Sequence, residues 1–229
     1  MSDLAERLDT VRAGIASAVS LAGVASPELI VVTKFHPASL VRELHALGVR
    51  GVGESRHQEA KAKSSELSDL DLTWHFVGQV QSKKAKQIAE YSRVIHSVDR
   101  ESLVAALPAD RRQADGAGES RLDVFLQINL TSDPARGGVQ ESGVERLAEQ
   151  VLAVPGLRLL GVMAVAPVDA EPRSAFARVH AASLRVRALD PAARFISAGM
   201  SGDYRETILE GATHLRIGSA ITGKRPEGR

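Results

Sequence analysis

The chain contains no cysteine, which excludes disulfide bonds, cysteine-ligated metal centres and a thiol nucleophile. Aromatic residues make up only 3% of the sequence, so a surface that stacks nucleic-acid bases is not expected. No apolar run approaches the roughly 18 residues that a membrane span requires. The formal net charge is +1, which gives no bulk attraction to nucleic acid or to a membrane. We therefore expect neither as a partner.

The amino-terminal segment is acidic and amphipathic, unlike a secretory signal, so a cytoplasmic location is expected. Apolar residues recur at helical spacing from Leu4 to Val19. Asp3 and Glu6 are spaced like a capping pair at the start of this helix. We expect residues 1–24 to form a helix that packs on the rest of the chain.

Eight short apolar runs alternate with helical patterns along the remaining chain. The runs are continuous, as in parallel strands that are buried on both faces. They are Leu29–Thr33, Gly51–Gly53, Trp74–Gly78, Val94–Val98, Val124–Leu130, Leu159–Val165, Phe195–Ala198 and Leu215–Ile217. This pattern predicts a single α/β domain over residues 1–229, a (β/α)8 TIM barrel with an added amino-terminal helix. An open doubly wound sheet is the alternative, but no glycine fingerprint follows the first run.

Segments with helical character lie between the runs, and two polar stretches predict loops. The predicted helices span residues 39–47, 55–67, 82–91, 101–107, 144–152, 174–189 and 203–210. The predicted loops are Pro108–Arg121 and Thr131–Gln140, both rich in turn-forming residues. Residues 224–229 have little to bury and are expected to form a disordered tail.

Lys34 follows the first apolar run directly, at the end of a strand where barrels of this kind keep their chemistry. Lysine is seldom buried without a partner. A partly desolvated lysine loses its proton more easily, and the neutral amine can attack a carbonyl to form an imine. The alternative is a lysine that extends from the strand end into water.

The last two predicted strands end in Gly/Ser-rich segments, Ser197–Ser201 and Gly218-Ser219. Glycine lets backbone amides approach an anion, and serine adds a donor. The phosphate site of many barrels follows strands seven and eight, so a phosphorylated ligand is expected here. Asp203 would repel a phosphate unless it points away. With Glu206 it can instead form a capping pair for the next helix.

Arg216 lies two residues before Gly218, so both belong to one face of the last strand. On the inner face, its permanent charge would lie near the ligand. The alternative is an ion pair with an internal carboxylate such as Glu54.

Other polar residues near the strand ends have structural alternatives. Ser55 and Gln58 are spaced like a capping box, and His75 is typical of a hydrogen-bonded core histidine. The lysines at 83, 84 and 86 indicate a solvated helix face, with a weak anion or partner site as the second interpretation.

Six segments, in order over nearly the whole chain, carry a family resemblance. They are Val31–Lys34, Gly53–Ser55, Trp74–Ser82, Leu160–Met163, Gly199–Asp203 and Arg216–Ile221. Together they resemble the YggS/PROSC family of pyridoxal 5′-phosphate (PLP) homeostasis proteins. The resemblance implies a single barrel similar to the N-terminal domain of alanine racemase, with PLP as its cofactor.

The resemblance also implies roles for individual residues. Lys34 would hold PLP as an imine, Arg216 would lie near the pyridine nitrogen, and the Gly/Ser segments would surround the phosphate. The cofactor-binding residues expected on this basis are Lys34, Ser55, Met163, Ser197, Gly199, Met200, Ser201, Arg216, Gly218 and Ser219. The family often has Asn at the position of Ser55 and a second lysine near His36, so the resemblance implies neither a hydrogen bond from Ser55 to the cofactor nor a second basic residue near the imine.

Family members carry or buffer PLP without an established turnover, which implies a role in vitamin B6 and amino-acid homeostasis. A monomer is expected, with PLP-dependent apo-enzymes as partners. The alternative is a racemase-like enzyme, which needs two acid/base groups. The second group in alanine racemase is a tyrosine from another domain, whereas this chain has only Tyr91 and Tyr204. An arginine at the pyridine nitrogen also makes the ring a poor electron sink. A second alternative is an enzyme in which Lys34 forms an imine with a sugar phosphate.

Overall fold

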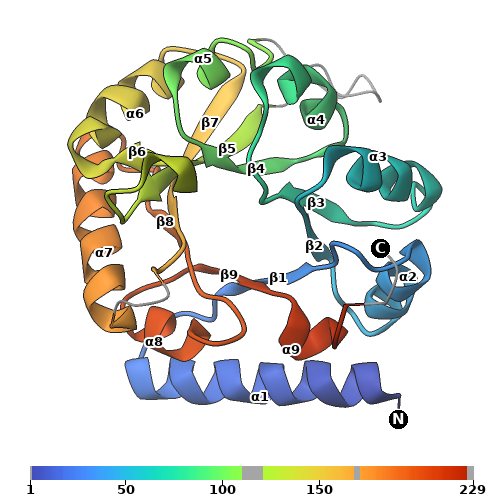
Figure 1. The fold of residues 1–229 in the computed structure, drawn as a ribbon. Helices are drawn as coiled ribbons and strands as arrows, with labels where there is room; N and C mark the ends of the chain where they lie inside the picture. The colour runs from blue at the N-terminus through green and yellow to red at the C-terminus, as the bar shows by residue number, and fades with distance from the viewer. Residues whose placement is uncertain (1, 110–120, 168–170, 226–229) are drawn as a thin grey trace.

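A computed structural model describes residues 2–109, 121–167 and 171–225 of the chain. Strands and helices alternate along it (Figure 1). The strands are β1 (Glu28–Val32), β2 (Gly51–Glu54), β3 (Thr73–Phe76), β4 (Val94–Val98), β5 (Leu122–Asn129), β6 (Val139–Gln140), β7 (Leu157–Ala164), β8 (Phe195–Ser197) and β9 (His214–Ile217). The α-helices are α1 (Asp3–Ala22), α2 (Ala38–Ala46), α3 (His57–Glu66), α4 (Ala85–Tyr91), α5 (Glu101–Val104), α6 (Val144–Leu152), α7 (Pro172–Leu189), α8 (Tyr204–Leu209) and α9 (Ser219–Thr222). Short 3-10 turns cover Ser82–Lys84, Pro134–Arg136 and Glu141–Gly143.

All strand pairs are parallel, and eight strands close into a barrel. The sheet runs in the order β4-β3-β2-β1-β9-β8-β7-β5, and a further pairing of β4 with β5 closes it. The short strand β6 pairs with the last two residues of β5, Ile128 and Asn129. The helices surround the barrel, as Figure 1 shows. The predicted (β/α)8 fold is therefore confirmed.

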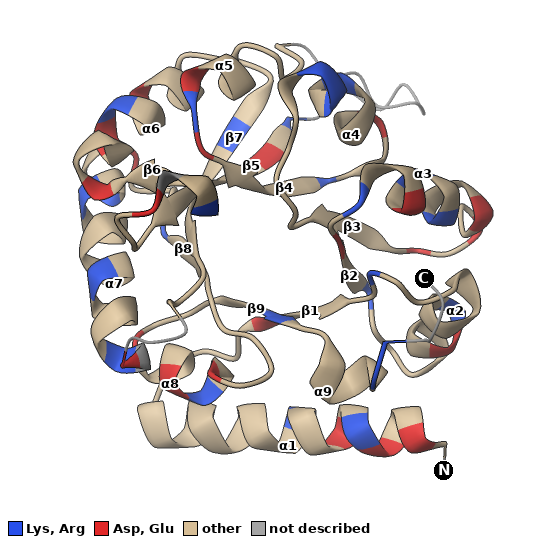
Figure 2. Ribbon diagram, in the orientation of Figure 1, with Lys and Arg blue, Asp and Glu red and all other residues tan. Residues whose placement is uncertain are grey.

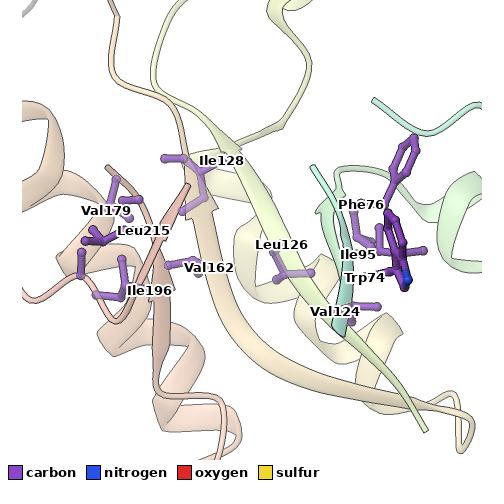
Figure 3. Close-up of a cluster of buried hydrophobic side chains, with 14 of the residues drawn as sticks. Trp74, Phe76, Ile95, Val124, Leu126, Ile128, Val162, Val179, Ile196 and Leu215 are labelled. Carbon is purple, nitrogen blue, oxygen red and sulfur yellow. The ribbon is translucent and has the colours of Figure 1, made fainter. Parts of the chain in front are cut away.

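The hydrophobic core has two parts, one on each side of the strand wall. Aliphatic and aromatic side chains such as Val124, Leu126 and Val162 pack between the strands and the helices (Figure 3). A smaller cluster of Val94, Phe125, Leu160, Met163 and Phe195 forms separately. Because side chains alternate along a strand, this second cluster fills the barrel interior. Charged residues lie mainly on the surrounding helices, with few on the strands (Figure 2).

A bulge in β7 interrupts the regular alternation. Val124 pairs with Leu159, but the next residue, Phe125, pairs with Gly161, so Leu160 is an extra residue. As a result both Leu160 and Met163 belong to the interior cluster. Gly161 has a φ of +148°, and a Cβ there would lie 1.9 Å from the carbonyl oxygen of Phe195 on β8. Only glycine fits this position.

Helix α1 packs on α8 and α9, outside the barrel (Figure 1). Its buried face includes Leu4, Leu8 and Val11, as the helical spacing predicts. The side chain of Ser2 caps the helix by accepting a hydrogen bond from the Ala5 amide (3.3 Å). The expected capping pair of Asp3 and Glu6 is therefore wrong, because the helix begins one residue earlier than that pair requires.

Most predicted elements match the structure within a few residues, and the exceptions are short. Strand β6 and a 3-10 turn lie inside the stretch 131–140 that was expected to be a loop, and helix α9 was not expected. Most of the loop predicted over 108–121, and residues 226–229 of the expected tail, lie outside the described residues. The guanidinium of Arg225 lies over the Phe35 ring, 4.0 Å from its centroid.

We predict that Gly161→Ala lowers the free energy of unfolding by about 2 kcal/mol or more, because the added Cβ meets backbone atoms that cannot move aside. Urea denaturation measures this effect. Gly202→Ala is the matched control, since nothing lies within 4 Å of its Cβ position. Equal stability of the two variants would show that the bulge tolerates a side chain.

Candidate functional site

The candidate residues gather at the carboxyl ends of three neighbouring strands. Strands β8, β9 and β1 lie side by side in the barrel, so the segments that follow them meet at one edge. Gly218, after β9, lies against the end of β1, since a Cβ built on it would be 3.4 Å from the carbonyl oxygen of Val32. Lys34 follows two residues after β1. The structure thus brings the Gly/Ser segments next to the lysine.

Two serine hydroxyls join the segments after β8 and β9. The Oγ atoms of Ser201 and Ser219 are 3.4 Å apart, and Ser201 Oγ accepts a hydrogen bond from the Ala220 amide (3.2 Å). Hydroxyl groups at a junction of two glycine-containing segments suit the oxygens of a phosphate. The two serines are 18 residues apart in the sequence, and the neighbouring strands β8 and β9 bring them together.

Gly199 and Asp203 shape the segment after β8. Gly199 has a φ of +94°, and a Cβ on it would lie 2.3 Å from Thr207 Oγ1. Asp203 Oδ1 accepts a hydrogen bond from the Met200 amide (2.6 Å) and makes no capping bond to α8. The expected capping pair of Asp203 and Glu206 is therefore wrong. Burial raises the pKa of Asp203, although the Met200 amide lowers it.

Arg216 is buried in the barrel without a carboxylate in contact. Its Nη1 donates to Ser197 Oγ (2.6 Å) and its Nη2 donates to the carbonyl oxygen of Ala164 (2.9 Å). Ser197 Oγ also contacts His96 Nδ1 at 2.8 Å. Burial lowers the pKa of Arg216 to about 10, so the guanidinium is still charged at neutral pH. The alternative pairing with Glu54 is wrong, because Glu54 contacts a different cation.

Lys34 lies in a turn and is exposed to solvent, so the expected partly desolvated amine is wrong. Its Nζ lies 5.8 Å from the centroid of the Phe35 ring, and it forms no ion pair with the described residues. Phe35 has a φ of +70°, a left-handed conformation that is unfavourable for a residue with a Cβ. Contacts with neighbouring groups must therefore stabilise the turn at Lys34 and Phe35.

A buried ionic cluster holds the Lys34 turn from behind. Glu59 Oε1 accepts a hydrogen bond from the Phe35 amide (2.6 Å). Lys63 Nζ donates to the carbonyl oxygen of Thr33 (2.9 Å) and to carboxylate oxygens of Glu54 and Glu59, each at 2.7 Å. The backbone on both sides of Lys34 is therefore bound to helix α3. The spacing of Glu59 and Lys63 is that of a helical ion pair, a signal present in the sequence.

The charged groups of Lys63 and Glu54 in this cluster are buried away from solvent. Lys63 is only 5% exposed and Glu54 only 1%. Burial raises the pKa of Glu54, whereas Lys63 and the Thr33 hydroxyl, which donates to Glu54 Oε1 (2.7 Å), lower it. Removal of Lys63 would leave Glu54 buried without its cation, whereas removal of Glu54 would leave Lys63 paired with Glu59.

The remaining candidates lie around the same end of the barrel. Met163 is buried in the interior cluster and pairs in register with Ser197, whereas Met200 is exposed. Ser55 follows β2 and does not cap α3, whose preceding residue is Arg56. The expected capping box of Ser55 and Gln58 is therefore wrong.

A cavity of about 760 Å³ lies beside this edge, next to the Lys34 turn. Its lining includes Phe35, Ser55, Arg56 and Lys84. Lys84 donates to Gln87 Oε1 (3.3 Å), and the other two lysines of its cluster, Lys83 and Lys86, are exposed, as a solvated face predicts.

Tyr204 points away from the site, toward helix α1. A Cβ built on Gly14 of α1 would lie 2.2 Å from the Tyr204 hydroxyl, so the phenol fills the space that this glycine leaves. Tyr91 contacts His57 Nδ1 through its hydroxyl (3.3 Å) on the helices. The phenol groups of both tyrosines are therefore engaged away from the Gly/Ser segments.

Two further observations concern membrane-spanning helices and metal sites. Within residues 2–109, 121–167 and 171–225, no helix has both the length and the apolar character of a membrane span. The side chains in these ranges also form no group of three His, Asp or Glu that could hold a metal ion.

The fold and the site define a parallel barrel with a lysine after its first strand and Gly/Ser segments after its last two. The alanine racemase N-terminal domain family matches residues 6–226. The chain is 41% identical over 234 residues to the pyridoxal phosphate homeostasis protein of Pseudomonas aeruginosa, covering all of this chain and 98% of the relative. It is 40% identical over 243 residues to the protein of that name from Mycobacterium tuberculosis, covering 98% and 93%. The chain belongs to the pyridoxal phosphate homeostasis proteins of the alanine racemase N-terminal domain family.

Solved structures agree with this assignment. PipY of Synechococcus elongatus, a structure with PLP bound, is 32% identical with a TM-score of 0.79, covering 96% of this chain and all of PipY. Alanine racemase of Corynebacterium glutamicum, at 16% identity and a TM-score of 0.70, shares the fold over 97% of this chain and 62% of the racemase.

We predict that Lys63→Met lowers the free energy of unfolding by about 3 kcal/mol, because Glu54 is left buried without its cation. Urea denaturation measures the loss. Lys61→Met, on the same helix, removes an exposed lysine 3.8 Å from Glu90 and should cost about 0.5 kcal/mol or less. Similar losses in both variants would contradict a stabilising role for the buried cluster.

We also predict that the protein loses stability as the pH falls from 7 toward 5. Burial lowers the pKa of His75 and His96 below the ordinary 6.5, so the unfolded chain binds protons that the folded chain does not. The stabilisation is complete above pH 6.5 and is lost below it, by up to about 1.4 kcal/mol per pH unit for each histidine. His96→Gln should reduce the slope of unfolding free energy against pH. An unchanged slope would show that His96 is charged in the folded protein.

Proposed function

We propose that this chain binds PLP at the carboxyl end of its barrel, as a Schiff base on Lys34, and carries it in vitamin B6 and amino-acid homeostasis. The observation that carries the proposal is the meeting of a free amine, hydroxyl donors and a buried guanidinium on the adjacent strands β1, β8 and β9. All of these groups belong to one barrel, which we propose is a single PLP-binding domain over residues 1–229.

The groups present fit the three polar parts of PLP, which are its aldehyde, its phosphate and its pyridine nitrogen. Lys34 would take the aldehyde. The hydroxyls of Ser201 and Ser219, with the backbone near Gly199 and Gly218, would hold the phosphate. Arg216 would face the pyridine nitrogen, and its charge has no carboxylate in contact that would compete. We propose Ser55, Met163 and Met200 as further contacts of the ring.

The role that we propose for Ser197 differs from that of Ser201 and Ser219. Its hydroxyl already contacts both Arg216 and His96. We therefore propose that Ser197 holds the arginine in place and that the phosphate is bound by Ser201 and Ser219.

When bound, PLP supplies an aldehyde that condenses with a primary amine, and a ring that can act as an electron sink. The exposed amine of Lys34 is available for that bond. The ionic cluster of Lys63, Glu54 and Glu59 fixes the turn from which the amine extends. An arginine at the ring nitrogen would keep that nitrogen unprotonated and weaken the electron sink.

A carrier is favoured over a racemase-like enzyme by the position of Tyr204. Racemisation needs an acid/base group on each face of the ring. Tyr204 packs against Gly14 of α1 and is not available as the second group. The names of the relatives support the same role, since they are called pyridoxal phosphate homeostasis proteins, and PipY was solved with PLP bound.

We further propose that the chain acts as a cytoplasmic monomer and exchanges PLP with PLP-dependent apo-enzymes. Mixing the PLP-loaded protein with an apo-enzyme and following the recovered activity tests the exchange. Recovery no faster than with an equal concentration of free PLP would argue against transfer.

We predict that the protein incubated with PLP absorbs at about 420 nm and that borohydride removes this band while fixing the cofactor to Lys34. Peptide mass spectrometry locates the modification. Lys34→Ala should lose the band but keep the fold, because the side chain is exposed. Lys61→Ala, another exposed lysine, is the matched control and should keep the band.

The alternatives give different results. A protein that never forms the band, but is trapped by borohydride with a sugar phosphate, would favour the sugar-phosphate enzyme. Interconversion of D- and L-amino acids above background would favour the racemase-like enzyme over a carrier.

A further inference from the structure

A continuous series of side-chain contacts crosses the barrel from its amino end to Arg216. Glu28, the first residue of β1, has Oε1 at 3.3 Å from His75 Nε2 on β3. His75 Nδ1 lies 2.9 Å from His96 Nε2 on β4. His96 Nδ1 lies 2.8 Å from Ser197 Oγ on β8, which accepts from Arg216 Nη1 at 2.6 Å. We call these five residues the barrel chain.

The barrel chain passes through the interior. Strands β4 and β8 are not neighbours in the sheet, so a contact between His96 and Ser197 must cross the space that the strands enclose. His96 and Ser197 are fully buried, and His75 is nearly so. Only Glu28 reaches solvent, with about half of its side chain exposed (47%).

Hydrogen-bond chemistry allows the barrel chain one direction when Glu28 is ionised. Arg216 can only donate, so Ser197 accepts from it and has its own proton for His96 Nδ1. His96 Nε2 then carries the proton and donates to His75 Nδ1. His75 Nε2 carries the next proton and points it at the Glu28 carboxylate. Every donor is directed toward the negative charge.

The opposite direction would place a bare nitrogen lone pair of His75 against Glu28. That arrangement needs a protonated carboxyl group or a charged histidine. Contacts with His214 and His75 hold the pKa of Glu28 well below its usual range, and burial lowers the pKa of His75. Both groups are therefore in the states that favour the first direction at neutral pH.

His75 Nε2 makes no hydrogen bond of full geometry among the described residues, and its 3.3 Å contact with Glu28 Oε1 is the longest contact in the barrel chain. Gly51 leaves the room for it, since its Cβ position is 3.6 Å from both Glu28 Oε1 and His75 Nε2. The Glu28 carboxylate, at 3.3 Å, is the acceptor toward which a proton on this nitrogen would be directed.

We propose that Glu28, His75, His96 and Ser197 are positioning residues for Arg216, and that the charge of Glu28 is transmitted through the directed barrel chain to the cofactor ring. This inference rests on the proposed function, because it assigns the ring nitrogen to Arg216. The barrel chain would direct the Ser197 hydrogen toward His96, so that the Ser197 oxygen presents a lone pair to the guanidinium of Arg216. The arginine would then keep one orientation toward the ring.

Other charged and titratable groups face the barrel chain, and the variants compared in any test must leave them unchanged. They are His214 on β9, Asp123 on β5 with its partners Arg93 and Arg158, and Asp203 after β8. None of them lies between Glu28 and Arg216 in the series of contacts.

The first test needs no cofactor. Nitrogen-15 NMR of the histidine side chains reports which ring nitrogen carries the proton. We expect His75 and His96 both to be neutral with the proton on Nε2, and Glu28→Gln to give a mixture of tautomers. A proton on Nδ1 of either histidine in the unsubstituted protein would overturn the directed chain.

The second test uses the PLP-loaded protein. We expect Glu28→Gln to lower the pH midpoint of the band near 420 nm by about half a pH unit, because loss of the carboxylate removes the charge that orients the barrel chain and, through it, Arg216. Glu43→Gln, the same change on the exposed outer side of α2, should leave the midpoint unchanged. An equal shift in both variants would overturn the proposal.

A double-mutant cycle separates transmission along the chain from a direct field effect. Ser197→Ala removes the contact with Arg216, so Glu28→Gln added to it should no longer move the midpoint. A shift as large as in the single variant would show that Glu28 acts through space and would overturn the proposal. Absence of the band from the unsubstituted protein would instead overturn the proposed function, while the NMR result still decides the direction of the chain.

Discussion

The closure of the parallel sheet by the pairing of β4 with β5 is the constraint on which the rest of the structure depends. An inward-facing polar group in a closed barrel has little access to water, so it must find its partners among the other inward-facing groups. The histidines, Ser197 and Arg216 satisfy one another for this reason. The same closure places the ends of β8, β9 and β1 in a row, which assembles the candidate site.

Sequence patterns predicted the barrel because its strands are continuous apolar runs and its helices are amphipathic. The glycine and serine residues after β8 and β9 could be identified from their position in that order. Strand β6 was missed because it is only two residues long and depends on the edge of β5 for its pairing. The wrong capping pairs depend on exact helix boundaries and on loop contacts. Helix α1 begins one residue too early for the Asp3 pair, and α3 begins one residue too late for the Ser55 pair. Asp203 instead accepts from the Met200 amide.

The ionic cluster and the histidines were harder to foresee. The spacing of Glu59 and Lys63 indicates only a helical pair, and the burial of Lys63 depends on how α3 packs on the barrel. His96 gives no local signal at all, because its partner Ser197 is 101 residues away on an opposite strand. Contacts across a barrel depend on strand register, which a single sequence does not specify.

The exposure of Lys34 has a consequence for kinetics. Within the part of the chain that the structure describes, the Lys34 side chain is exposed, so its amine can be reached from water directly. Cofactor entry and exit would then be governed by diffusion and by the chemistry of bond formation, and selectivity would come from the Gly/Ser segments after β8 and β9. Rapid reversible access of this kind suits a protein that binds and releases a cofactor, whereas an enzyme gains from a closed site that excludes water.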